Sequence, residues 1–223
     1  MSAATLERGL DVFQDLYLRG PTAGRPALRQ AVLDQISAPW RNANGDKVPV
    51  TSTRNGDALA FERAAGGDLA AAGLVLWSRP DGYEIGNIVP LEPGELSFAA
   101  YNAILQDFVA RVAEPAAGKT GFTVETTPAR QSLDAWLSPQ AQQALRRFSR
   151  AANKATGSTH PADRQRWFWF LLQVHADKQK IGTLELERWL TEIEGWGEKR
   201  AGKLVVEYEF ALHLLDTYDE HGR

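Results

Sequence analysis

The spacing of apolar residues changes along the chain, and this change limits the fold more than any other sequence feature. Between about residues 48 and 89, apolar residues occur in short stretches that turn residues separate. After residue 128 they recur mostly at every third or fourth position. Short bounded stretches are typical of strands, and the spacing of three to four is typical of amphipathic helices. We therefore expect an α+β protein whose second part is helical.

The predicted sheet is an antiparallel meander of about four to five strands covered by helices. Asn55-Gly56 predicts a hairpin, because both turn residues readily adopt positive φ. A second turn is expected at Pro80-Asp81-Gly82, after an apolar stretch that predicts a central strand. The expected strands are 48–54, 57–63, 74–77, 83–89 and 122–126.

Helices are predicted on both sides of this sheet segment. In the first part they cover 5–18, 26–37 and about 98–112, and residues 115–121 are expected to form a loop. In the second part they cover 139–153, about 161–177, a segment from Thr183 and about 198–219. We therefore predict a sheet domain over 1–128 and a bundle of about four helices over 129–223. Whether the two pack as one body is left open.

Charge is distributed unevenly along the chain. Residues 130–180 contain nine Lys and Arg against three Asp, whereas the whole chain has a net charge of −3. The same segment contains the apolar run Trp167-Phe168-Trp169-Phe170-Leu171-Leu172. A basic, aromatic-rich helical segment indicates a macromolecular partner. The simpler alternative is that it pairs with the acidic residues of the C-terminal segment.

The candidate binding residues lie on two consecutive helices of this basic segment. A Lys/Arg face on helices can follow a phosphate backbone, and Trp with Arg also dominates protein-binding hot spots. The candidates, for a protein or a nucleic-acid partner, are Arg146, Arg147, Arg150, Lys154, Arg164, Arg166 and Trp169.

Several kinds of active site are excluded or disfavoured by the sequence. The absence of cysteine excludes disulfides, thiolate metal sites and cysteine nucleophiles. No phosphate-binding glycine loop or Gly-x-Ser-x-Gly motif is present, so we predict no cofactor and no metal. An enzyme would need a site assembled from scattered residues such as His160, Asp163 and a C-terminal Glu. Pro161 and Asp163 are also ordinary residues for a helix N-terminus. A small-ligand corner at Asn87 and Asn102 is a weaker alternative.

These observations favour a non-enzymatic protein-binding module, with an antitoxin, immunity or defence-accessory role as its expected setting. A nucleic-acid-binding component is the first alternative, and an enzyme with a scattered site is the second. No apolar run approaches the ~20 residues of a membrane span. Residues 1–8 lack the layout of a signal peptide. We therefore expect a cytoplasmic, bacterial protein with a protein partner.

Overall fold

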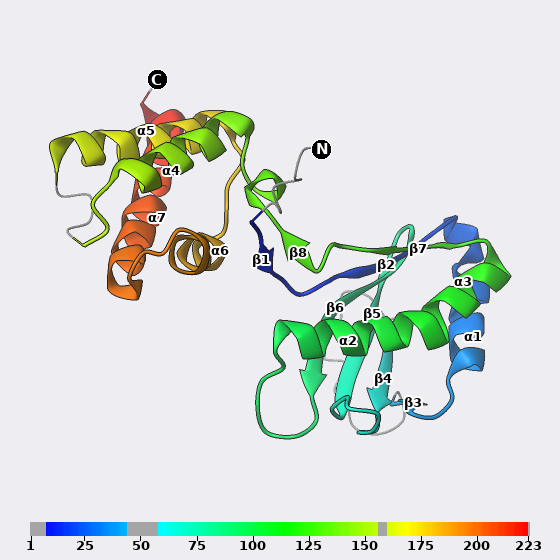
Figure 1. Ribbon diagram of the computed structural model, residues 1–223. Coiled ribbons are helices and arrows are strands. Elements are labelled where there is room, and N and C mark those ends of the chain that lie inside the picture. Colours follow the sequence, from blue (N-terminus) through cyan, green and yellow to red (C-terminus); the bar gives the residue numbers. More distant parts are fainter. Residues whose placement is uncertain (1–7, 44–57, 156–159, 223) are drawn as a thin grey trace, which may run out of the picture. The chain divides into compact units, whose positions relative to one another are not determined.

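The computed structural model describes residues 8–43, 58–155 and 160–222, which form two compact units. One is a sheet unit over Val12–Ala129, and the other is a helical unit that joins residues 8–11 to those from Arg130 onward. The mixed α/β content is confirmed (Figure 1). That 1–128 and 129–223 are separate domains stays a prediction. The predicted strand 48–54 and its Asn55-Gly56 turn lie outside the described residues.

The sheet unit contains one antiparallel sheet, in the order β3-β4-β5-β6-β2-β7. Three of its strands, β4, β5 and β6, match predicted strands of the meander, and β6 follows β5 through the predicted turn at Gly82. β3, which pairs with β4 on its other edge, was not predicted as a strand. The described sheet therefore has six strands, more than the four to five expected. The strands are β2 (Leu16–Arg19), β3 (Trp40–Asn42), β4 (Leu59–Arg63), β5 (Ala72–Arg79), β6 (Gly82–Pro90) and β7 (Thr123–Thr126).

The predicted helix over 5–18 is wrong over its described part, because β2 lies there as an internal strand. Leu16 pairs with Ile85 of β6 on one side and with Thr126 of β7 on the other. Leu16 and Leu18 are fully buried and alternate with more exposed neighbours. The position between β6 and β7 needs a strand that hydrogen bonds on both edges. This pairing with two neighbouring strands outweighs the helical spacing of the apolar residues in this segment.

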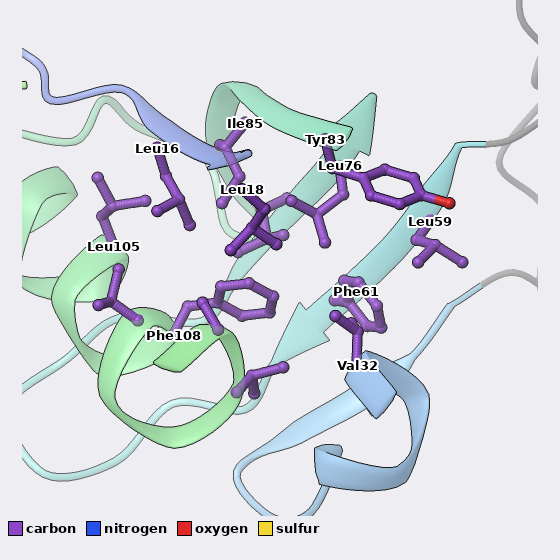
Figure 2. Packing of buried hydrophobic residues seen from close by; sticks show 14 of the residues in the cluster. Leu16, Leu18, Val32, Leu59, Phe61, Leu76, Tyr83, Ile85, Leu105 and Phe108 are labelled. Atoms are coloured by element: carbon purple, nitrogen blue, oxygen red, sulfur yellow. The ribbon is translucent and has the colours of Figure 1, made fainter. Parts of the chain in front are cut away.

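Three helices cover the sheet: α1 (Arg25–Gln35), α2 (Phe98–Phe108) and α3 (Glu114–Thr120). Ser97 caps α2 as expected, because its Oγ accepts a hydrogen bond from the Ala100 backbone N–H at 3.2 Å. Side chains from α1, α2 and the sheet converge in one apolar core (Figure 2). Its labelled members are Leu16, Leu18, Val32, Leu59, Phe61, Leu76, Tyr83, Ile85, Leu105 and Phe108.

The predicted loop over 115–121 is wrong, because these residues form most of helix α3. A π-helical turn over Val109–Ala113 continues α2 directly into α3. Pro115 lacks a backbone N–H, so it is tolerated in the first turn of α3 that follows this wider turn. The helix ends at Gly121, whose φ of 72° is the left-handed conformation that favours glycine.

A buried ion pair ties the sheet to α2. Arg63 on β4 contacts Asp107 on α2, with Nε 3.1 Å from Oδ2. Trp40 Nε1 donates to the same oxygen at 2.8 Å, and Arg111 Nε donates to Oδ1 at 2.7 Å. Burial by itself would raise the pKa of Asp107. Hydrogen bonds from Arg111, Trp40 and Arg63 outweigh burial and hold that pKa below its ordinary value.

The lowered pKa of Asp107 predicts a loss of stability in acid. A carboxyl whose pKa is lower in the folded state contributes stability above its unfolded value of 3.8. This contribution is lost as the pH falls through the folded pKa. Lysine contacts lower the pKa of Asp216 and of Asp219 in the same way, so both add to the effect. We expect the free energy of unfolding to fall below about pH 4.

Urea unfolding at about pH 5 and about pH 3 measures this loss. The Asp107→Asn variant is less stable at neutral pH, but it should lose less between the two pH values than the wild type. An equal loss in both proteins would show that Asp107 contributes nothing to the acid sensitivity.

The helical unit contains α4 (Pro139–Ala151), α5 (Pro161–Asp177), α6 (Thr183–Arg188) and α7 (Glu198–His221). A π-helical turn over Trp189–Ile193 extends α6. A two-stranded sheet of β1 (Leu10–Asp11) and β8 (Arg130–Gln131) also belongs to this unit. Ser138 caps α4 as expected, because its Oγ accepts from the Ala141 backbone N–H at 3.1 Å.

Aromatic rings form the centre of the helical unit. The fully buried Trp167 of α5 contacts Phe148 of α4, with ring centroids 5.0 Å apart, and Phe170, at 5.1 Å. Phe148 stacks on Trp196 at 5.2 Å, and Phe170 stacks on Tyr208 of α7 at 6.1 Å. One continuous aromatic cluster therefore joins α4, α5 and α7.

The polar atoms of two of these rings also have partners. Trp196 Nε1 donates to the buried Ser149 Oγ at 2.8 Å, and the Tyr208 hydroxyl donates to the Ile181 carbonyl at 2.8 Å. Burial raises the pKa of Tyr208 to about 12. The hydroxyl therefore stays protonated and continues to donate.

Candidate binding site

The apolar run of α5 divides into a buried face and an exposed face. Trp167, Phe170 and Leu171 are buried at the spacing of one helical face. The residues between and beyond them, Phe168, Trp169 and Leu172, are exposed, and 56% of Trp169 is open to solvent. Burial of one face as core therefore leaves three large apolar side chains on the other.

The exposed face of α5 and the adjoining side of α4 line an open pocket of about 490 Å³, the α4–α5 groove. Exposed apolar side chains beside arginines are the composition of a recognition surface. The groove is lined by Ala144, Arg147, Ala162, Gln165, Arg166, Phe168, Trp169 and Leu172.

Three of the predicted arginines lie together on α4. Arg146, Arg147 and Arg150 line a second hollow of about 730 Å³, and Arg147 is common to this hollow and the α4–α5 groove. In the part of the chain that the structure describes, no carboxylate pairs with any of the three. Their positive charges are therefore available to a partner.

The remaining predicted arginines have contacts within α5. Arg166 lines the groove, and its Nη1 donates to Asp163 Oδ1 at 2.6 Å. Arg164 lies over the ring of Phe168, 5.4 Å from its centroid. These contacts orient both guanidinium groups, and the buried Asp163 offsets the charge of Arg166.

Lys154 has a different environment from the other candidates. It follows the end of α4, and its Nζ donates to the backbone carbonyl of Glu194. Lys154 does not line either hollow of the α4 and α5 surface. Five of the seven predicted residues therefore line one or both of the two hollows. Arg164 lies next to the groove because it contacts the ring of Phe168. Lys154 lies outside both hollows and binds the Glu194 carbonyl.

His160 and Asp163 do not form the pair that a catalytic site would need. His160 Nδ1 accepts from the Ala162 backbone N–H at 3.3 Å as the cap of α5, whereas Asp163 accepts from Arg166. Among the described residues, no group of three His, Asp or Glu side chains is placed to hold a metal ion.

The suggested ligand corner is a structural network. Asn87 is exposed, whereas Asn102 is buried. Asn102 Oδ1 accepts from the Gln14 backbone N–H at 2.8 Å, and its Nδ2 donates to the Val12 carbonyl at 2.9 Å. Asn102 therefore holds the chain before β2 against α2, with both its amide oxygen and its amide nitrogen bonded to the backbone.

Sequence reasoning missed Phe168 and Leu172 as groove residues. Four consecutive aromatic residues point in all directions around a helix, so the run alone does not separate core from surface. The signal was the stripe of Trp167, Phe170, Leu171 and Val174, which repeats at positions i, i+3, i+4 and i+7. Assigning that stripe to the core leaves Phe168, Trp169 and Leu172 outside it.

No known protein family, curated protein or solved structure matches this chain. Within residues 8–43, 58–155 and 160–222, no helix is both long enough and apolar enough to span a bilayer.

Proposed function

We propose that this chain is a non-enzymatic protein-binding module and that the α4–α5 groove is its recognition site. The observation that supports the proposal is the meeting of the exposed Trp169 and Phe168 with Arg147 in one open pocket. Its partner is a protein segment that inserts an apolar side chain into the groove and presents Asp or Glu to the arginines beside it.

The apolar lining of the groove provides the affinity. Trp side chains bury 150–250 Å² when fully covered, and covering the open part of Trp169 contributes about 2–3 kcal/mol. Phe168 and Leu172 add to that surface. A Trp with Arg at the centre of an interface is the usual composition of a binding hot spot.

The arginines provide the selectivity for acidic partners. Arg147 borders the groove, and Arg146 and Arg150 extend the positive charge along α4. A carboxylate placed between them forms charge-assisted hydrogen bonds, which are about twice as strong as neutral ones. The chain as a whole has a net charge of −3, so the basic hollow has the opposite sign to the average charge of the molecule.

The proposal is tested with paired substitutions in the groove. We expect Arg147→Glu and Trp169→Ala each to weaken partner binding by at least about tenfold, the effect of a hot-spot residue. The partner is recovered from nuclease-treated native lysate on the wild-type protein, identified by mass spectrometry, purified and titrated by calorimetry. Both side chains are exposed, so the variants should unfold at the wild-type urea concentration.

Lys119→Glu is the matched control for charge. Lys119 is an exposed residue of α3 in the sheet unit, and its reversal changes the net charge by the same amount as Arg147→Glu. This variant should bind as tightly as the wild type. Equal weakening by Arg147→Glu and Lys119→Glu, or unchanged binding by Trp169→Ala, would show that the groove is not the recognition site.

A nucleic-acid partner is the second candidate function, and one observation favours it. Arg146, Arg147 and Arg150 have no carboxylate partner in the described chain, and Arg147 lines the same pocket as the exposed Trp169. Basic grooves with an aromatic platform bind single strands through phosphate contacts and base stacking. Titration of a fluorescent single-stranded oligonucleotide should then show affinity that falls steeply with salt and is lost in Arg147→Glu.

The setting of the protein is part of the same proposal. We expect a cytoplasmic encounter with the partner in a bacterial cell. The identity of the recovered partner tests the expectation of an antitoxin, immunity or defence-accessory role.

A further inference from the structure

The α4–α5 groove runs along the two helices that line it. Its α5 residues, from Ala162 to Leu172, lie on one side of that helix and extend over about 15 Å, at 1.5 Å per residue. Helix α4 packs beside α5 (Figure 1). The start of α4 meets the end of α5, because the Ser138 hydroxyl donates to Asp177. The groove is therefore a channel about three helical turns long between two antiparallel helices.

The two sides of this channel differ in chemistry. The α5 side is apolar at Phe168, Trp169 and Leu172. The α4 side contains Arg147, and Arg150 lies three positions further along, on the same side of α4. Within the described chain, no carboxylate pairs with either arginine. The channel therefore complements an occupant that is apolar on one side and acidic on the adjoining side.

The channel offers no backbone groups to an incoming chain. The N–H and C=O groups along α4 and α5 are bonded within each helix. An extended segment lying on Phe168, Trp169 and Leu172 would leave the N–H and C=O groups that face this apolar side without partners, which is costly. A helix bonds the same groups internally. An occupant that covers the apolar side along the channel must therefore bring its own backbone hydrogen bonds.

We propose, resting on the function proposed above, that the occupant of the α4–α5 groove is an acidic amphipathic α-helix of the partner protein. Its apolar residues recur at intervals of three and four and cover Phe168, Trp169 and Leu172. Asp or Glu residues one turn apart on the adjoining face of the same helix form ion pairs with Arg147 and Arg150. We call these carboxylates the acidic row.

A random peptide library displayed on phage tests the conformation of the occupant. Peptides of about 16 residues, enough for four turns, are selected on the full-length protein and depleted on Trp169→Ala. The enriched peptides should have apolar residues at intervals of three and four and an acidic row beside them. Circular dichroism should show helix gained on binding. A proline at the centre of such a peptide should weaken binding at least about tenfold, because it breaks the helix.

The acidic row is tested on the tightest of these peptides. Replacing one of its Glu residues by Gln should weaken binding to the wild type about three- to fivefold, the range of an exposed ion pair. The same peptide change should leave binding to the double variant Arg147→Gln/Arg150→Gln unchanged, because the partner charges are already absent. Gln in place of Glu on the opposite face of the peptide is the control and should change neither affinity. Equal weakening in both proteins overturns the pairing of the acidic row with these arginines.

The selection also separates failure of the helix from failure of the groove. Peptides that need Trp169 but tolerate the central proline, or that gain no helix on binding, overturn the helical occupant and leave the groove as the recognition site. If no selected peptide distinguishes the wild type from Trp169→Ala, the groove itself is overturned as the recognition site, and the helical occupant with it.

Discussion

Arg63→Ala is expected to lower the free energy of unfolding of the sheet unit by about 3–5 kcal/mol, the cost of breaking a buried ion pair from one side. Arg63 is only 4% exposed, and its removal leaves Asp107 with Trp40 of β3 as its contact from the sheet. The guanidinium also donates to the carbonyls of Ala64, Gly66 and Leu69 at 2.9–3.2 Å. The substitution therefore weakens the attachment of α2 to the sheet and frees the turn after β4.

Urea unfolding followed by circular dichroism measures this effect, and Arg41→Ala is its control. Arg41 lies on the neighbouring strand β3 and pairs with Glu62, but its side chain is largely exposed. An exposed pair contributes about 0–1 kcal/mol, so Arg41→Ala should unfold close to the wild type. Similar losses in both variants would show that burial adds nothing to the Arg63 contact.

Trp167→Ala is expected to destabilise the helical unit by about 3–5 kcal/mol, the usual cost of removing a buried aromatic side chain. Trp167 contacts both Phe148 and Phe170, so its removal opens a cavity between α4 and α5 that neighbouring rings cannot fill without moving. The same urea experiment measures the loss.

Trp169→Ala is the matched control, because it removes the same side chain two positions along the same helix. Trp169 is more than half exposed and contributes to the groove instead of the core. Its removal should change the free energy of unfolding by less than about 0.5 kcal/mol. The two variants thus separate stability from binding: Trp167→Ala should unfold early, and Trp169→Ala should stay folded and lose the partner. A strongly destabilised Trp169→Ala would contradict this division of α5.

The elements that depend on local chemistry were predictable from the sequence. The Ser97 and Ser138 caps mark the starts of α2 and α4, and Pro161 marks the start of α5. The meander strands within the described residues follow from short apolar stretches between turns. The Arg and Trp residues of the candidate site were also visible as a basic, aromatic-rich segment. All of these signals come from residues close together in the chain.

The tertiary structure decided which of these residues meet. Leu16 becomes a strand residue because β6 and β7, about 70 and 110 residues away, offer it hydrogen bonds on both sides. Lys154 donates to the backbone carbonyl of Glu194, 40 residues further along the chain. Arg147 instead lines the open groove together with Trp169. Periodicity and capping are short-range properties that sequence determines by itself. Three features depend instead on residues distant in the sequence, so only the folded chain determines them. They are the insertion of β2 between two strands, the pairing of individual charged side chains, and the exposure of particular aromatic side chains.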